Sequence, residues 1–209
     1  MDQRLFLVRG AVLGASLILL TGCLGLQQPS RFYVLGAPPR AEPASAAVPA
    51  EQGPTIGLGP LTLPKYLDRP QLVTRTSPYE LKFAEFERWA EPLEVNFSRV
   101  LAENLAVHIP TDHLNLFPWS RNTPIEYQVT VDVTEFYGHR DGQSVLLAQW
   151  SIFKGEGKEV LLSRKSRFGA SAGTQDYGAM VAAMSQTVAD LSREIAAALR
   201  TLATQSATR

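Results

Sequence analysis

The chain of 209 residues has one cysteine, three histidines and no excess of either charge. Its 20 basic and 20 acidic side chains balance, so the composition favours neither nucleic acid nor an anionic membrane face as a partner. A single cysteine excludes an internal disulfide and a cysteine-rich metal site. The apolar run Ala11–Leu20 is also too short for a membrane span, which needs about twenty residues. Stability must therefore come from an apolar core.

The only cysteine lies where a lipid anchor is attached in bacterial lipoproteins. Two arginines precede the apolar run Ala11–Leu20, and Leu20-Thr21-Gly22-Cys23 closes it. This pattern resembles the lipobox, whose cysteine is diacylated on sulfur and becomes the first mature residue. We therefore expect residues 1–22 to be a signal peptide and Cys23 to be lipidated, with two or more acyl chains holding the protein firmly to the bilayer. An ordinary secretory signal with a chance cysteine is the alternative.

The residue after Cys23 is Leu24 and not aspartate, which among Gram-negative lipoproteins is typical of sorting to the outer membrane. We expect the protein to be anchored in the outer membrane and to face the periplasm. Acylation also consumes the only thiol, which leaves no cysteine nucleophile.

A shift in composition separates this N-terminus from a folded domain. Residues Ala37–Pro54 are rich in proline, alanine and glutamate and show no apolar period, as in an extended spacer. We therefore assign residues 23–54 to the lipidated N-terminus and linker, a spacer able to reach on the order of 100 Å, and residues 55–204 to one domain. Arg31–Leu35, however, is rich in β-prone aromatics and is predicted to dock as an edge strand.

Periodicity predicts an α+β domain with a largely antiparallel sheet. Apolar and polar residues alternate strictly over Ile125–Thr134, which indicates a strand with one buried face. Two tight turns join it to two further strands as an antiparallel meander. The other predicted strands are 56–63, 71–76 and 80–87.

Two helices are predicted to pack against this sheet. One begins at Pro92 and ends before Pro110, and its apolar residues recur at helical spacing. The other is a long C-terminal helix from Tyr177 to Leu202, with Asp176 as its N-cap. A coiled-coil partner could use the same apolar stripe, but packing on the chain's own sheet is commoner.

Several segments together resemble a known family. The lipobox, the Arg31–Leu35 segment, Leu63–Val73 and the helix start at Trp89–Leu93 are similar to those of the ABC-type transport auxiliary lipoproteins, the PqiC family. The resemblance runs through the mature chain. It implies an outer-membrane lipoprotein that works with an MCE (mammalian cell entry) domain protein, in a system that moves lipids between the inner and outer membranes and preserves envelope integrity.

Four residues are candidate partner contacts. Tyr66, Asp68 and Arg69 lie in the Leu63–Val73 segment, and Trp89 precedes a helix, where tryptophan is a frequent interface anchor. The structural alternative is that Tyr66 fills the core, Asp68 and Arg69 pair or cap the turn, and Trp89 packs as a hydrophobic staple.

A serine hydrolase is the rival from another class. Gly169–Gly173 matches G-x-S-x-G around Ser171, but no histidine follows His139, so the required order of nucleophile, acid and histidine is missing. Ser171 is interpreted as a joint between strand and helix. Neither His108 nor His113 has metal-ligand spacing. We therefore predict no enzyme activity, cofactor or metal.

The sequence thus predicts a non-enzymatic accessory that binds an MCE-domain protein and contacts the outer-membrane bilayer through acylated Cys23. A general envelope assembly or structural lipoprotein is the second hypothesis. Self-association stays open, because sheet edges in Ile125–Phe168 could pair between copies to form a homo-oligomer.

Overall fold

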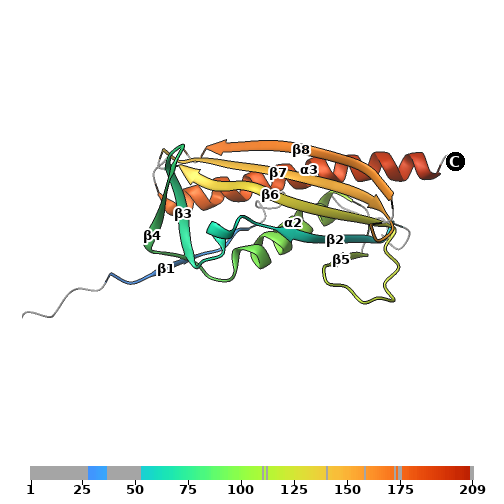
Figure 1. Ribbon diagram of the computed structural model, residues 1–209, viewed down its shortest axis with the longest axis horizontal. Helices are drawn as coiled ribbons and strands as arrows, with labels where there is room; N and C mark the ends of the chain where they lie inside the picture. The colour runs from blue at the N-terminus through green and yellow to red at the C-terminus, as the bar shows by residue number, and fades with distance from the viewer. Residues whose placement is uncertain are drawn as a thin grey trace, which may run out of the picture. The chain divides into compact units, whose positions relative to one another are not determined.

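The described part of the chain is an eight-stranded mixed sheet with two α-helices on it (Figure 1). In this computed structural model the described residues are 28–36, 53–109, 111, 113–139, 141–157, 159–171, 173 and 176–207. The predicted signal peptide, Cys23 and nearly all of the Ala37–Pro54 segment lie outside them. None of the helices in the described ranges has the length and hydropathy of a membrane span.

In chain order the elements are β1 (Arg31–Tyr33), β2 (Ile56–Thr62), the 3₁₀ helix η2 (Lys65–Leu67), β3 (Gln71–Ser77), β4 (Glu80–Trp89), α2 (Leu93–His108), β5 (Leu114–Leu116), β6 (Tyr127–His139), β7 (Gln143–Lys154), β8 (Glu159–Ser171) and α3 (Tyr177–Ala207). The predicted α+β class, with two packed helices and a long one at the C-terminus, is confirmed.

The predicted meander of β6, β7 and β8 is also confirmed, and its strands are antiparallel along their whole length. Alternate side chains of β6 from Tyr127 to Val133 are buried, as the pattern required. A register shift between Val133 and Glu135 then brings Phe136 onto the buried face, and β6 continues to His139. The strand is therefore longer than its alternating segment.

The other edge of β6 makes the sheet mixed. β2 runs parallel to the first half of β6, and β3 runs parallel to its end, where Thr74 and Arg75 lie beside Gly138 and His139. Between these two pairings the connection 63–70 leaves the sheet. Further parallel pairs join β1 to β4 and β5 to β2, whereas β3 and β4 form the predicted antiparallel hairpin.

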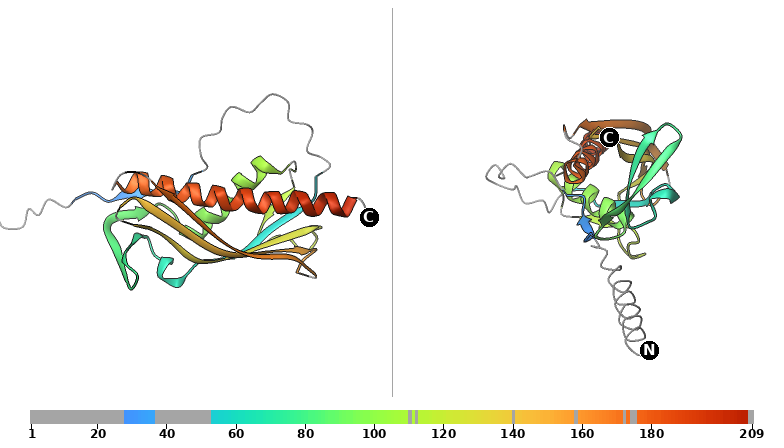
Figure 2. Two further views of the ribbon diagram at one scale, coloured as in Figure 1. Left: turned by 90° about the horizontal axis from the view of Figure 1, so that it is seen from above. Right: turned by 90° about the vertical axis from the view of Figure 1, so that its left-hand side faces the viewer.

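Both helices pack against the rest of the fold through their apolar faces. α3 runs lengthwise along the meander and contacts β6, β7 and β8, while α2 packs against α3 and β2 (Figure 2). The rings of Phe97 on α2 and Phe136 on β6 meet edge to face at 5.2 Å. Asp176 Oδ2 accepts a hydrogen bond of 3.1 Å from the backbone N–H of Ala179, which confirms the predicted N-cap.

β1 is the edge strand predicted from the Arg31–Leu35 segment. It pairs in parallel with the end of β4, and Arg31 Nη2 forms a salt bridge of 2.7 Å with Glu87. Just beyond β1, the backbone of Leu35 makes two hydrogen bonds with the side-chain amide of Asn96 on α2. The compact unit of the chain thus begins at Arg31, inside the range 23–54 that was assigned to the lipidated N-terminus and linker.

Candidate functional site

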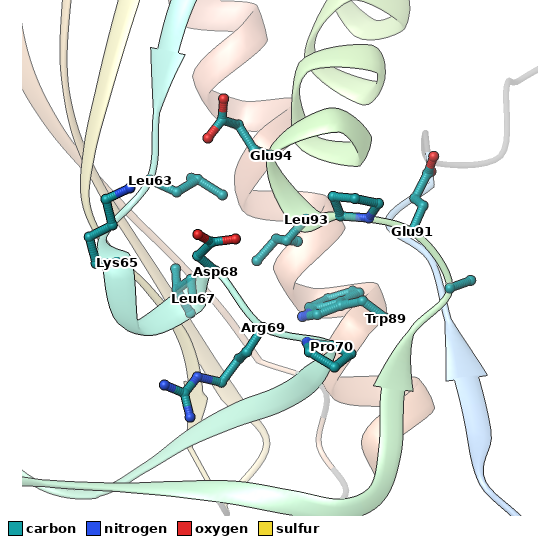
Figure 3. A pocket seen from close by; sticks show the side chains of 12 residues that line it. Leu63, Lys65, Leu67, Asp68, Arg69, Pro70, Trp89, Glu91, Leu93 and Glu94 are labelled. Carbon is teal, nitrogen blue, oxygen red and sulfur yellow. The ribbon is translucent and has the colours of Figure 1, made fainter.

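A cavity of about 430 Å³ opens between the connection 63–70 and the start of α2 (Figure 3). All of its lining residues come from two segments, 63–70 and 89–94. These segments contain most of the two motifs that carried the family resemblance, Leu63–Val73 and Trp89–Leu93. Residues more than twenty positions apart in the sequence therefore form one surface.

The backbone explains why the two segments meet. The N–H of Trp89 donates a hydrogen bond of 2.6 Å to the carbonyl oxygen of Pro70, so the end of β4 is tied to the last residue of the connection. Asp68 has φ −75° and ψ 65°, and the N–H of Arg69 bonds to the oxygen of Leu67 at 2.8 Å. This is an inverse γ-turn. The connection therefore turns sharply at Asp68, between η2 and β3.

The walls of the cavity are apolar. Leu67, Trp89 and Leu93 contribute side chains that also belong to the core, and Trp89 is only 5% exposed. Figure 3 shows the indole of Trp89 beside Pro70. A buried side chain that still lines a cavity presents a fixed apolar surface, and this spares a ligand the entropy of ordering it.

The acidic side chains that line the cavity differ in whether they already have a hydrogen-bond partner. Asp68 directs its carboxylate into the cavity, and Glu94 in the first turn of α2 lies at its upper end (Figure 3). Within the described residues neither carboxylate has an ion pair or hydrogen bond, whereas Glu91 is paired with Arg99 at 2.6 Å. The cavity therefore offers two carboxylates that are ready to accept hydrogen bonds above apolar walls.

Of the other two predicted contacts, Arg69 lines the cavity and Tyr66 does not. The guanidinium carbon of Arg69 is 3.9 Å from the centre of the Phe83 ring, so its charge is directed away from the cavity, although Arg69 also lines it. Tyr66 is half-buried outside the lining, and burial raises the pKa of its hydroxyl. The structure thus brings Asp68, Arg69 and Trp89 to one cavity but not Tyr66.

Lys65 and Glu94 are among the cavity residues that sequence reasoning did not single out. Each lies within or next to a motif that had been singled out, yet each looks like an ordinary solvated charge. Only the meeting of the two segments sets these two residues apart from other surface charges.

The hydrolase motif has a different local structure from a nucleophile elbow. Ser171 is the last residue of β8 and is paired with Gln143 on β7, and its hydroxyl accepts a hydrogen bond from the N–H of Gly173. An elbow needs its serine on a sharp turn from strand to helix. Moreover, β7 separates β8 from β6, which ends at His139. Among the described residues no three His, Cys, Asp or Glu side chains gather as metal ligands would.

Comparison with known proteins identifies the class. Residues 33–196 match the family described as ABC-type transport auxiliary lipoprotein component, so the chain belongs to this family of transport components. Both cavity segments lie inside the matched range. The chain is similar to the intermembrane transport lipoprotein PqiC of Escherichia coli (strain K12), with 24% identity over 180 residues that cover 84% of this chain and 91% of the relative. PqiC of Shigella flexneri matches with the same figures.

Solved structures share the fold. A crystal structure of an uncharacterized protein superposes with a TM-score of 0.66 at 21% identity, covering 82% of this chain and 99% of that chain. A protein from Xanthomonas campestris gives a TM-score of 0.65 at 14% identity, with 86% and 100% covered. The predicted membership of a PqiC-like family is therefore confirmed, and the family is one of transport auxiliary components and not of enzymes.

Proposed function

We propose that the protein is a non-enzymatic accessory subunit that binds the MCE-domain protein of an ABC transport system moving lipids between the inner and outer membranes. The observation that carries this proposal is the cavity between residues 63–70 and 89–94. The description of the family and the name of the E. coli relative support a role in transport between membranes.

The cavity is suited to a protein partner. Its walls, which include Leu67 and Trp89, are held in place by the core, while Asp68 and Glu94 can accept hydrogen bonds from a partner's donors. A central apolar pocket with tryptophan, surrounded by polar groups, is the usual make-up of an interface hot spot. Asp68 and Glu94 would then set orientation, and the apolar walls would supply affinity.

Binding to the purified cognate MCE-domain protein tests the proposal. Asp68→Lys and Glu94→Lys each place a cation where the partner's donors would lie, and we expect each to weaken binding about tenfold, or ~1.4 kcal/mol. Glu159→Lys at the start of β8 is the matched control, because it makes the same charge reversal on an exposed residue outside the cavity.

Measurements of the free energy of unfolding distinguish a loss of binding from a folding defect. Asp68 is exposed, so Asp68→Lys should change the free energy of unfolding by no more than about 0.5 kcal/mol. Unchanged affinity in both cavity variants, or no binding by the wild type, would refute the proposed role.

The proposed location is the periplasmic face of the outer membrane, with acylated Cys23 as the anchor. Crosslinking in intact cells, comparing wild type with Cys23→Ala, identifies the partners, and mass spectrometry of the N-terminus detects the acyl chains. Recovery of cell-wall or outer-membrane assembly factors in place of an MCE-domain protein would favour the second hypothesis, a general envelope assembly lipoprotein.

A further inference from the structure

The distance between the lipid anchor and the folded unit follows from where that unit begins. Because β1 belongs to the sheet, only seven residues separate Cys23 from Arg31. Eight residue steps span at most about 28 Å when fully extended. If the first docked residue were Ile56, the same limit would be about 110 Å. The docking of β1 therefore shortens the predicted tether roughly fourfold.

The attachment of β1 is held at several points. Glu87, which forms the salt bridge with Arg31, is itself buried, and Asn96, which binds both backbone groups of Leu35, is buried as well. One residue further on, the N–H of Gly36 donates to Ser185 Oγ on α3 at 3.2 Å. The short segment is thus fixed to β4, to α2 and to α3.

The outward side chains of this segment are apolar. Tyr33 and Leu35 pack towards the core, whereas Phe32 is 65% exposed and Val34 is 51% exposed. β1 is also the terminal strand of the sheet, with β4 as its only partner among the described strands. Two neighbouring apolar side chains therefore point away from the core at the part of the fold that lies nearest along the chain to Cys23.

We propose that the segment Arg31–Leu35, which contains β1, is a membrane-contacting edge, in which Phe32 and Val34 insert into the headgroup layer of the leaflet that holds acylated Cys23. The length of the chain selects the bilayer as the occupant, because β1 cannot move further than about 28 Å from the anchor. Aromatic and aliphatic side chains are the ones that bury at this boundary. The inference rests on the proposed acylation of Cys23 but not on the identity of the protein partner.

This contact would place the cavity beside the membrane. Tyr33 pairs with Trp89 across the β1–β4 ladder, and Trp89 lines the cavity. Adjacent strands lie about 4.8 Å apart, so the cavity begins one strand away from the membrane-contacting edge. A partner bound in the cavity would lie close to the lipid headgroups.

The test uses the acylated full-length protein in vesicles of phosphatidylethanolamine and phosphatidylglycerol. Cys23 is the only cysteine, so once it is acylated an introduced cysteine is the single free thiol. Phe32→Cys and Val34→Cys are each labelled with a polarity-sensitive fluorophore. Tyr79→Cys, 100% exposed in the turn between β3 and β4, and Val160→Cys, 59% exposed on β8, are the matched controls.

We expect the labels at positions 32 and 34 to shift to shorter emission wavelengths on the vesicles and to be quenched several-fold by lipids with brominated acyl chains. The controls should keep the emission seen in water. Labels at 32 and 34 that behave like those at 79 and 160 would overturn the proposal. A shift that needs no vesicles and grows with protein concentration would also overturn it, because a second copy would then cover β1.

The two proposals can fail independently. The vesicle experiment contains no partner, and the affinity of the cavity variants for the MCE-domain protein is measured without vesicles. If Phe32→Cys does not fold by circular dichroism, Val34→Cys gives the same readout from the neighbouring outward position.

Discussion

The meander and the edge that carries the cavity are built differently. In the meander, strands of 13, 12 and 13 residues pair along their length beneath α3. At the edge, β1 has three residues, the β3–β4 pair has two register shifts, and Phe32 and Tyr79 are exposed. Long pairing, with a single register shift in each strand pair, buries the core, whereas the edge presents apolar side chains and a cavity. We infer that the meander maintains the fold and that the edge carries recognition.

Replacing a large side chain in each region is expected to give the largest contrast. Trp150 on β7 is buried, and its indole donates to Ser166, which donates in turn to Glu194 on α3. We expect Trp150→Ala to lower the free energy of unfolding by about 3–5 kcal/mol in urea denaturation. Phe83→Ala on β4, where the residue is 41% exposed, should lower the free energy of unfolding by about 1 kcal/mol or less.

Trp150→Phe keeps an aromatic ring in the meander and removes the hydrogen bond to Ser166, so its cost should fall between these two values. If Trp150→Ala and Phe83→Ala lowered the free energy of unfolding equally, the two regions would contribute alike to stability. That result would contradict the proposed difference between the meander and the edge.

A smaller effect is expected where the meander meets α3. A Cβ at Gly138 would collide with the sulfur and Cγ of Met180 on α3, so the helix and β6 touch at this glycine. We expect Gly138→Ala to cost about 1–3 kcal/mol by overpacking. In a double-mutant cycle with Met180→Ala, the combined loss should be smaller than the sum of the two single losses. If the two losses in the free energy of unfolding were strictly additive, the contact between Gly138 and Met180 would not limit the packing of α3 on β6.

The smallest effect is expected from His108 at the end of α2, the helix that begins at the cavity. Burial lowers the pKa of His108, and the cations Arg193 and Arg200 lower it further. The unfolded chain takes up this proton at about pH 6.5, and the folded chain takes it up only at lower pH. Unfolding therefore binds a proton in this window, and the free energy of unfolding falls as the pH drops from 7 through 6.5 towards the folded pKa.

Urea denaturation at several pH values measures this dependence. His108→Gln should reduce the decline on the acidic side, while the difference between variant and wild type stays constant above neutral pH. An unchanged slope in His108→Gln would assign the pH dependence to other groups.

Periodic segments were predictable from the sequence because periodicity reports which side of an element is buried. The alternation of Ile125–Thr134, the apolar stripe of α3 and the cap at Asp176 all repeat within a few residues. The same local information predicted that Arg31–Leu35 is an edge strand and that the family motifs contain candidate partner contacts.

Neighbours in the sheet were not predictable in the same way. Nothing local in β2 or β3 indicates that both lie parallel to β6, because alternation fixes a face and not a partner strand. Likewise, a charged residue in a motif, such as Glu94, has the same local pattern whether or not a cavity forms beside it.

The sequence by itself determined the α+β class, the faces that are buried and the pattern around Cys23 that predicts a lipid anchor, because each depends on residues close together in the chain. Only the tertiary structure decided that residues 63–70 meet residues 89–94 and that β1 is held by Glu87 and Asn96. These contacts join distant segments, and their free energy depends on the packing of the whole core, which no local pattern records.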